Sequence, residues 1–233
     1  MALHFPPRQV ANVSVPSGHL IDSAIELAYV HLTPQAFNHI MRSFLFGVVI
    51  ASHVLKLSDK FDAEVHALSA ILHDLGWDKN GTFVSKDKRF EVDGAIAARD
   101  FLSNSTYSNH WPHHRIQLVW DSIALHTNPS IFNFKENEVR ICGLGIDADF
   151  QGPDGSPPGS LSWDEYDAVV KEYPRVGFVQ TVKDVFIGLC RTKPATTYDN
   201  VVGDIGEAYV KGYSRDGHRF SDQLRRTEET LGP

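Results

Sequence analysis

Residues 62–76 read DAEVHALSAILHDLG, and this stretch decides how the rest of the chain is interpreted. Asp62 is a suitable helix cap, apolar residues follow it at helical spacing, and Gly76 is of the type that ends helices. The stretch therefore predicts a buried helix that ends in the polar pair His73-Asp74. A buried carboxylate without a partner costs several kcal/mol, so Asp74 requires a metal ion or a cation nearby.

The same apolar spacing recurs on both sides of this helix, and no segment shows the period-two alternation of strands. The pattern predicts an all-α fold of eight or nine helices. We expect a single domain over residues 1–233, with an irregular N-terminal segment at 1–18 and a Pro/Gly loop at 151–160. The helices are expected from about residue 20, and over about 34–55, 62–76, 89–102, 112–126, 138–150, from 162, 176–192 and 201–213.

Charge and composition exclude several classes of partner. The formal net charge is −7, and no run of Lys and Arg is present, so nucleic acid is not an expected partner. No stretch approaches the roughly 18 apolar residues of a membrane helix, and the first residues lack a leader pattern, so we expect a cytoplasmic protein without a membrane partner. Cys142 and Cys190 lie in apolar segments and are expected to be free and buried. The sequence leaves open whether the protein forms a homo-oligomer.

Two more polar residues lie on helices that otherwise carry apolar residues. His39 stands between Phe37 and Ile40, and Asp147 stands between apolar neighbours in the helix expected at 138–150. Taken singly, such a residue is more often structural than functional. Taken with His73-Asp74, they form a set of His and Asp residues on separate helices, which is a suitable set of ligands for a divalent metal.

The ordered set His39, His73-Asp74 and Asp147 resembles the H…HD…D signature of the HD-domain superfamily. Within it, the sequence is most similar to the cyanamide hydratase-like proteins, over roughly residues 20–200. The motifs that carry this similarity are Phe37-Asn38-His39 with Arg42, Leu72-His73-Asp74 with Asp78-Lys79-Asn80, Phe90-Glu91, Ile123 to His126, and Tyr173-Pro174-Arg175.

The resemblance implies an all-helical enzyme in which His39, His73, Asp74 and Asp147 bind one divalent metal. Zinc is the usual metal of the hydratase, with Fe²⁺ or Mn²⁺ as alternatives. It further implies that metal-bound hydroxide adds to a small nitrile-type substrate, as in the conversion of cyanamide to urea.

Proton transfer has three candidate residues: Asp78, Glu91 and His126. Each also has a structural interpretation, respectively as a solvated turn residue, an acid at a helix N-terminus and a cation at a helix C-terminus. Glu91 and His126 are also candidates for a second metal site. We expect the cluster formed by His110, His113 and His114 to lie at the surface.

Two other functions fit the same residues. One is hydrolysis of a small phosphate ester or nucleotide, which requires cations near the ligands. Arg42, Lys79 and Arg89 are available, but the sequence shows no basic cluster. The other is a non-catalytic helical scaffold.

Overall fold

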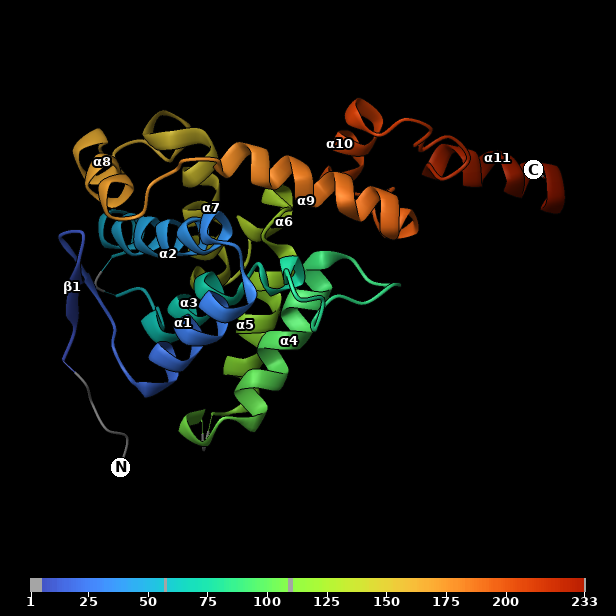
Figure 1. Cartoon of the computed structure of the whole chain (residues 1–233). Helices are drawn as coiled ribbons and strands as arrows, with labels where there is room; N and C mark the ends of the chain where they lie inside the picture. Colours follow the sequence, from blue (N-terminus) through green and yellow to red (C-terminus); the bar gives the residue numbers. More distant parts are fainter. Residues whose placement is uncertain (1–5, 57, 109–110, 233) are drawn as a thin grey trace. The chain divides into compact units, whose positions relative to one another are not determined.

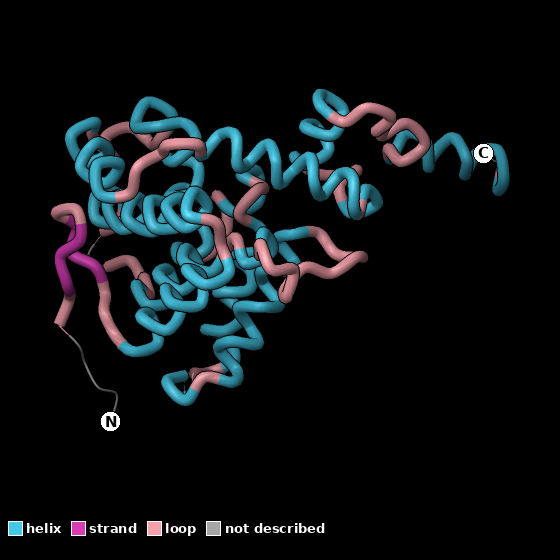
Figure 2. The backbone as a smooth tube through the Cα atoms, viewed as in Figure 1, coloured by secondary structure: helices cyan, strands magenta, loops and turns pink. Residues whose placement is uncertain are grey.

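The computed structural model describes residues 6–56, 58–108 and 111–232. Within them the chain is almost entirely helical, and the only strands form one short hairpin (Figure 2). The expectation of a mainly α-helical fold is confirmed. The eleven α-helices are α1 (His19–His31), α2 (Pro34–Val54), α3 (Ala63–Leu72), α4 (Phe90–Asn104), α5 (His113–Leu125), α6 (Pro129–Phe132), α7 (Asn137–Gly155), α8 (Trp163–Glu172), α9 (Phe178–Thr192), α10 (Val201–Tyr209) and α11 (Phe220–Leu231).

Each of the nine expected helices has a counterpart, but the structure differs from the sequence-based prediction in several places. Short α6 and the C-terminal α11 bring the number above the expected eight or nine. Part of the segment expected to be irregular forms an antiparallel hairpin of β1 (Arg8–Val10) and β2 (Val13–Val15). Finally, α7 continues to Gly155, into the expected loop, across a break at Gly152, where φ is 69°.

The chain divides into two compact units. The first comprises Met1–Val84 and Phe90–Phe178, and the second comprises Ser85–Arg89 and Val179–Pro233. Within the second unit, the buried Lys193 ammonium donates to the carbonyl of Lys88 at 2.9 Å, which attaches the short segment to the C-terminal helices. The expectation of a single domain stays a prediction.

Helix α3 forms the centre of the first unit, and all of its residues from Val65 to Leu72 are buried. The Asp62 side chain accepts from the backbone amides of Glu64 and Val65, and it also forms an ion pair with Arg115 of α5 at 2.7 Å. These contacts satisfy the first amides of the helix, as a capping residue should. Helix α3 ends at Leu72, earlier than expected, and the 3₁₀-helix η1 (Leu75–Trp77) follows.

Helix α2 packs along α7, and α3 lies against both of them (Figure 1). The three helices meet at glycines. A Cβ atom at Gly145 of α7 would lie 2.8 Å from the backbone nitrogen of Gly47 in α2, and one at Gly47 would lie 2.5 Å from Nε2 of His66 in α3. Because real Cβ atoms do not come so close to other atoms, the packing requires glycine at both positions. This close approach fixes the α2 side chains against those of α7.

Both cysteines are free and buried, as the sequence predicts. Among the described residues, we find no helix that combines the length and the apolar character needed to cross a bilayer.

His66 is expected to make the stability of the protein depend on pH. Its ring is fully buried on α3, and burial lowers its pKa from 6.5 to about 4. The unfolded chain therefore binds a proton more readily than the folded chain between these pH values. The contribution of His66 to stability is intact above pH 6.5 and is lost as the pH falls towards 4, by up to roughly 3 kcal/mol.

The measurement is urea unfolding at a series of pH values for the wild type and for His66→Gln, which does not titrate. The variant should lose less free energy of unfolding than the wild type between pH 7 and pH 4.5. His114→Gln, at an exposed histidine, is the control. Identical pH profiles for the wild type and His66→Gln would show that His66 does not titrate differently in the folded and unfolded chains.

Candidate metal centre

Three of the four predicted ligands come together in the interior of the first unit. His39 extends from α2, while His73 and Asp74 follow the last residue of α3. The Nε2 atoms of His39 and His73 lie 3.3 Å apart, and Oδ2 of Asp74 lies 3.2 Å from Nε2 of His73 and 3.6 Å from Nε2 of His39. All three side chains are at most 1% exposed.

In both His39 and His73, the Nδ1 atom, which faces away from the centre, donates a hydrogen bond to an acceptor. Nδ1 of His39 donates to Oδ2 of Asp149 at 2.6 Å, and Nδ1 of His73 donates to the carbonyl of Ala70 at 2.9 Å. Since a carboxylate and a carbonyl can only accept, the proton of each neutral ring lies on Nδ1. Both Nε2 lone pairs therefore point into the centre, in the arrangement typical of histidines that bind a metal.

The donor set fits a divalent metal. Potential ligand atoms of His39, His73 and Asp74 all lie within 4.8 Å of one another. Tetrahedral zinc with bonds of about 2.1 Å separates its ligand atoms by about 3.4 Å, close to the separations found here. Both carboxylate oxygens of Asp74 are buried and lack a hydrogen-bond partner among the described residues. A cation between these atoms would supply the charge that the carboxylate lacks.

In the metal-free protein the charges of the three side chains shift one another's pKa values. Burial raises the pKa of Asp74, but the neighbouring His73 and His39 outweigh it, so the pKa lies below its ordinary value. Burial likewise lowers the pKa of His73, but attraction to Asp74 outweighs it and raises the pKa. His39 has a lowered pKa because of its burial. The pKa values of His73 and Asp74 thus shift in opposite directions, because each charge favours the other.

Asp149 is a site residue that the sequence-based prediction missed. Besides accepting from His39, its carboxylate accepts from Nε and Nη2 of Arg42, both at 2.7 Å, and from Arg175. Burial raises the pKa of Asp149, but the hydrogen bonds and charges of His39 and Arg42 lower it to about 2. Asp149 is therefore ionised, and it orients His39 while neutralising a fully buried arginine. The available signal was Arg42 itself, a motif arginine on a buried helix face that requires an acid.

Asp147 does not join the group. It is half-buried on α7, and no hydrogen bond or ion pair is found for it among the described residues. Burial alone raises its pKa to about 6. Two helical residues differ by about 200° in direction, so Asp147 and Asp149 point to nearly opposite sides of α7, and it is Asp149 that faces α2. The assignment of Asp147 as a fourth ligand stays a prediction without support from the arrangement.

His126 and Glu91 lie beside the centre. The ring of His126 is 4.9 Å from that of His73, and its Nδ1 donates to the carbonyl of Ile123 at 2.7 Å. Burial and the charge of His73 lower the pKa of His126 to about 4, so its Nε2 is a lone-pair acceptor at neutral pH. Buried Glu91 accepts from the hydroxyl of the adjacent Thr127 at 2.7 Å. Glu91 is also close enough to His126 for its charge to raise the pKa of that ring, so the two residues are neighbours beside His73.

Asp78 has a structural role. Its carboxylate contacts Nδ1 of His31 at 3.0 Å and accepts from the backbone amides of Asn80 at 2.9 Å and Phe83 at 3.2 Å. Burial raises its pKa, but these hydrogen bonds together lower it. Asp78 therefore holds the turn after η1, and the structure does not bring it to the three ligands.

The other candidate histidines do not form a second cluster in the described chain. His113 and His114 are exposed at the start of α5, as expected, and His110 lies outside the described residues. The candidate cations are also engaged. Arg42 binds Asp149, and the ammonium of Lys79 donates to the carbonyl of Leu32 at 2.8 Å. Arg89 belongs to the second unit.

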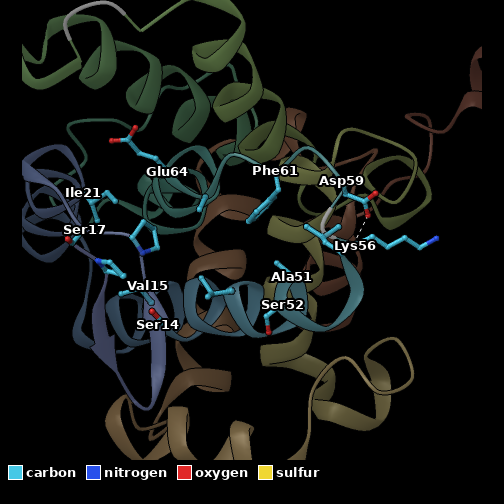
Figure 3. A pocket seen from close by; sticks show the side chains of 15 residues that line it. Ser14, Val15, Ser17, Ile21, Ala51, Ser52, Lys56, Asp59, Phe61 and Glu64 are labelled. Atoms are coloured by element: carbon cyan, nitrogen blue, oxygen red, sulfur yellow. Dashed lines mark hydrogen bonds between the residues drawn. The ribbon is translucent and has the colours of Figure 1, made fainter. Parts of the chain in front are cut away.

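A cavity of about 940 Å³ lies elsewhere in the first unit, among the hairpin, the C-terminal end of α2 and the start of α3. Figure 3 shows Val15, Ala51 and Phe61 around it. None of the predicted site residues lines it. On α2 the cavity begins at Val48, about 14 Å along the helix from His39.

Neither a scan against models of protein families nor a search of curated proteins gives a match for this chain.

Proposed function

We propose that this chain is a metal-dependent enzyme of the HD-domain type that hydrates a small nitrile. The observation that supports it most is the enclosed group of His39, His73 and Asp74, in which two imidazole lone pairs and an unpartnered carboxylate face one point. Zinc suits these ligands, with Fe²⁺ or Mn²⁺ as alternatives. The sequence resemblance to cyanamide hydratase-like proteins suggests the reaction, which is hydration of a nitrile.

Hydration converts R–C≡N and one water into R–C(=O)–NH₂. The oxygen of the water bonds to the nitrile carbon, and both hydrogens end on the nitrogen. When bound, a divalent metal lets water ionise at a pKa of about 7 and so supplies hydroxide at neutral pH. His39, His73 and Asp74 hold the metal, while Asp149 keeps His39 in its ligating tautomer.

The residues beside the ligands transfer the protons in this proposal. Neutral His126 presents Nε2 as an acceptor, because Nδ1 carries the proton that binds the Ile123 carbonyl. It can take a proton from water and return it to the nitrile nitrogen. Glu91, bound to Thr127, is the second candidate for this exchange. Asp78, the third candidate from the sequence, accepts instead from the backbone amides of Asn80 and Phe83.

The arrangement favours a small neutral substrate over a phosphate ester. A phosphate requires cationic partners, but the guanidinium groups of Arg42 and Arg175 both bind Asp149. The three ligands are also almost completely enclosed. A compact, uncharged nitrile needs no cationic partner and is small enough for an enclosed site.

The test is a substrate screen on purified protein of measured metal content. We expect about one metal per chain and conversion of cyanamide to urea, with activity lost on chelation and restored by Zn²⁺. Phosphate release from small phosphate esters or nucleotides, without nitrile hydration, would instead support the phosphohydrolase. Protein that neither binds metal nor turns over either class would support the scaffold.

A further inference from the structure

Aromatic rings pack against both histidines of the centre. Trp77 and Phe178 both stack on His39, at centroid distances of 6.1 and 4.6 Å, and His126 lies against His73. These three covering side chains are at most 8% exposed. An entrance for a substrate is expected where a side chain that contacts a ligand also borders solvent.

Phe150 is that side chain. Its ring packs edge-on against His39 at a centroid distance of 5.4 Å, yet the residue is 49% exposed. Among the described residues with ring contacts to the three ligands, it is the one that is substantially exposed. The ring of Phe150 thus contacts a ligand while the residue also borders solvent.

The backbone around Phe150 is held independently of its ring. Pro153 lacks an amide hydrogen, so it cannot donate to the carbonyl of Asp149 four residues earlier, and Arg175 donates to that carbonyl instead. The Arg175 guanidinium also lies 5.1 Å from the centroid of the Phe178 ring. Arg175 thereby holds Asp149 and Phe178, while the exposed ring of Phe150 contacts Phe178 at a centroid distance of 5.2 Å.

We propose that Phe150 closes the entrance to the metal centre and sets the size of the molecule that reaches it. Access requires the Phe150 ring to turn away from His39, while Phe178 and Trp77 stay in place. The part concerning substrate size rests on the proposed nitrile hydration; the part concerning access does not. For a substrate, the ring admits compact nitriles and excludes those with bulky substituents.

The first measurement is the rate at which pyridine-2,6-dicarboxylate removes Zn²⁺ from the loaded protein. Phe150→Ala is expected to lose metal severalfold faster than the wild type, and Phe150→Trp more slowly. Phe134→Ala is the matched control, because Phe134 is 87% exposed in the turn after α6 and has no ring contact with the ligands. Binding of azide to the Co²⁺-loaded proteins, followed by visible absorption, should show the same order of rates.

The second measurement is selectivity between cyanamide and a nitrile with a larger substituent, such as benzonitrile. Phe150→Ala is expected to shift the ratio of kcat/KM towards the larger nitrile by roughly 10-fold or more, the range that small changes in pocket size produce. Thermal unfolding of the variants shows whether each is folded, and metal analysis shows whether each is loaded.

The outcomes separate the two proposals. Faster metal loss and azide binding in Phe150→Ala, with no nitrile turned over by any variant, would support the entrance and overturn the hydratase. Nitrile hydration with unchanged rates and selectivity in folded, loaded Phe150→Ala would support the hydratase and overturn the entrance. Wild-type protein that binds no metal would overturn both.

Discussion

Replacing Asp74 by asparagine is expected to abolish stoichiometric metal binding and, with it, activity. The carboxylate is the negatively charged member of the group, and both of its oxygens are buried without a hydrogen-bond partner. Metal affinity should fall by more than the roughly 10- to 100-fold that loss of an outer hydrogen-bond partner costs. Elemental analysis after dialysis and a Zn²⁺ titration against a competing chelator measure the effect.

The same substitution tests whether Asp74 is present for binding or for folding. Asparagine removes both the cost of burying the charge and its attraction to His73, so the metal-free variant should still fold and unfold cooperatively in urea. Asp87→Asn, at a side chain that is 76% exposed, is the control for metal content. Full metal content in Asp74→Asn would contradict the assignment.

The variant Asp147→Asn tests the sequence-based assignment of Asp147 as a fourth metal ligand. From the position of Asp147 on α7, we expect this variant to keep its metal. Loss of metal would show instead that Asp147 is a ligand and that α7 rearranges when the metal binds.

Replacing Asp149 by leucine is expected to damage stability and metal binding together. Arg42 is fully buried, and without Asp149 its charge lacks the carboxylate that neutralises it. Breaking a buried pair in this way costs about 3–5 kcal/mol. His39 also loses the acceptor that orients its ring, which should weaken metal binding roughly 10- to 100-fold. Urea unfolding of the metal-free protein and a Zn²⁺ titration measure the two effects separately.

A double variant separates the two roles of Asp149. Arg42→Met combined with Asp149→Leu removes both buried charges, so most of the lost stability should return. The affinity for Zn²⁺ should stay low because His39 still lacks its acceptor. If the double variant recovered full affinity as well, Asp149 would act through the stability of the helix pair rather than through His39.

The sequence predicted the parts of the centre that depend on local pattern. His73-Asp74 follows an apolar helix with a cap, and both features are visible within 15 residues. Asp149 could not be found in this way, because its role comes from the packing of α2 on α7, between residues more than 100 positions apart. Asp147 and Asp149 differ by half a turn, and apolar spacing alone did not show which of them faces α2.

The missed hairpin has a related cause. Its turn is formed by Ala11 and Asn12, whose φ values are 50° and 64°. Such two-residue turns are predicted from glycine at these positions, most often Asn-Gly, and Ala-Asn lacks that signal. The strands are also only three residues long, too short for alternation to be seen.

The glycine contacts of α2 bear on which ions the centre accepts. Gly47 touches α7 at Gly145 and α3 at His66, so the helix that carries His39 rests directly on those that carry Asp149 and precede His73. Bare backbone cannot be compressed, and interlocked helices do not separate without losing their packing. The spacing of the ligands is therefore nearly fixed. An ion that requires bonds of about 2.3–2.6 Å, such as Ca²⁺, would have to spread the helices, whereas one with bonds of about 2.0–2.2 Å would not. We therefore expect the centre to select its ion by radius as well as by ligand chemistry.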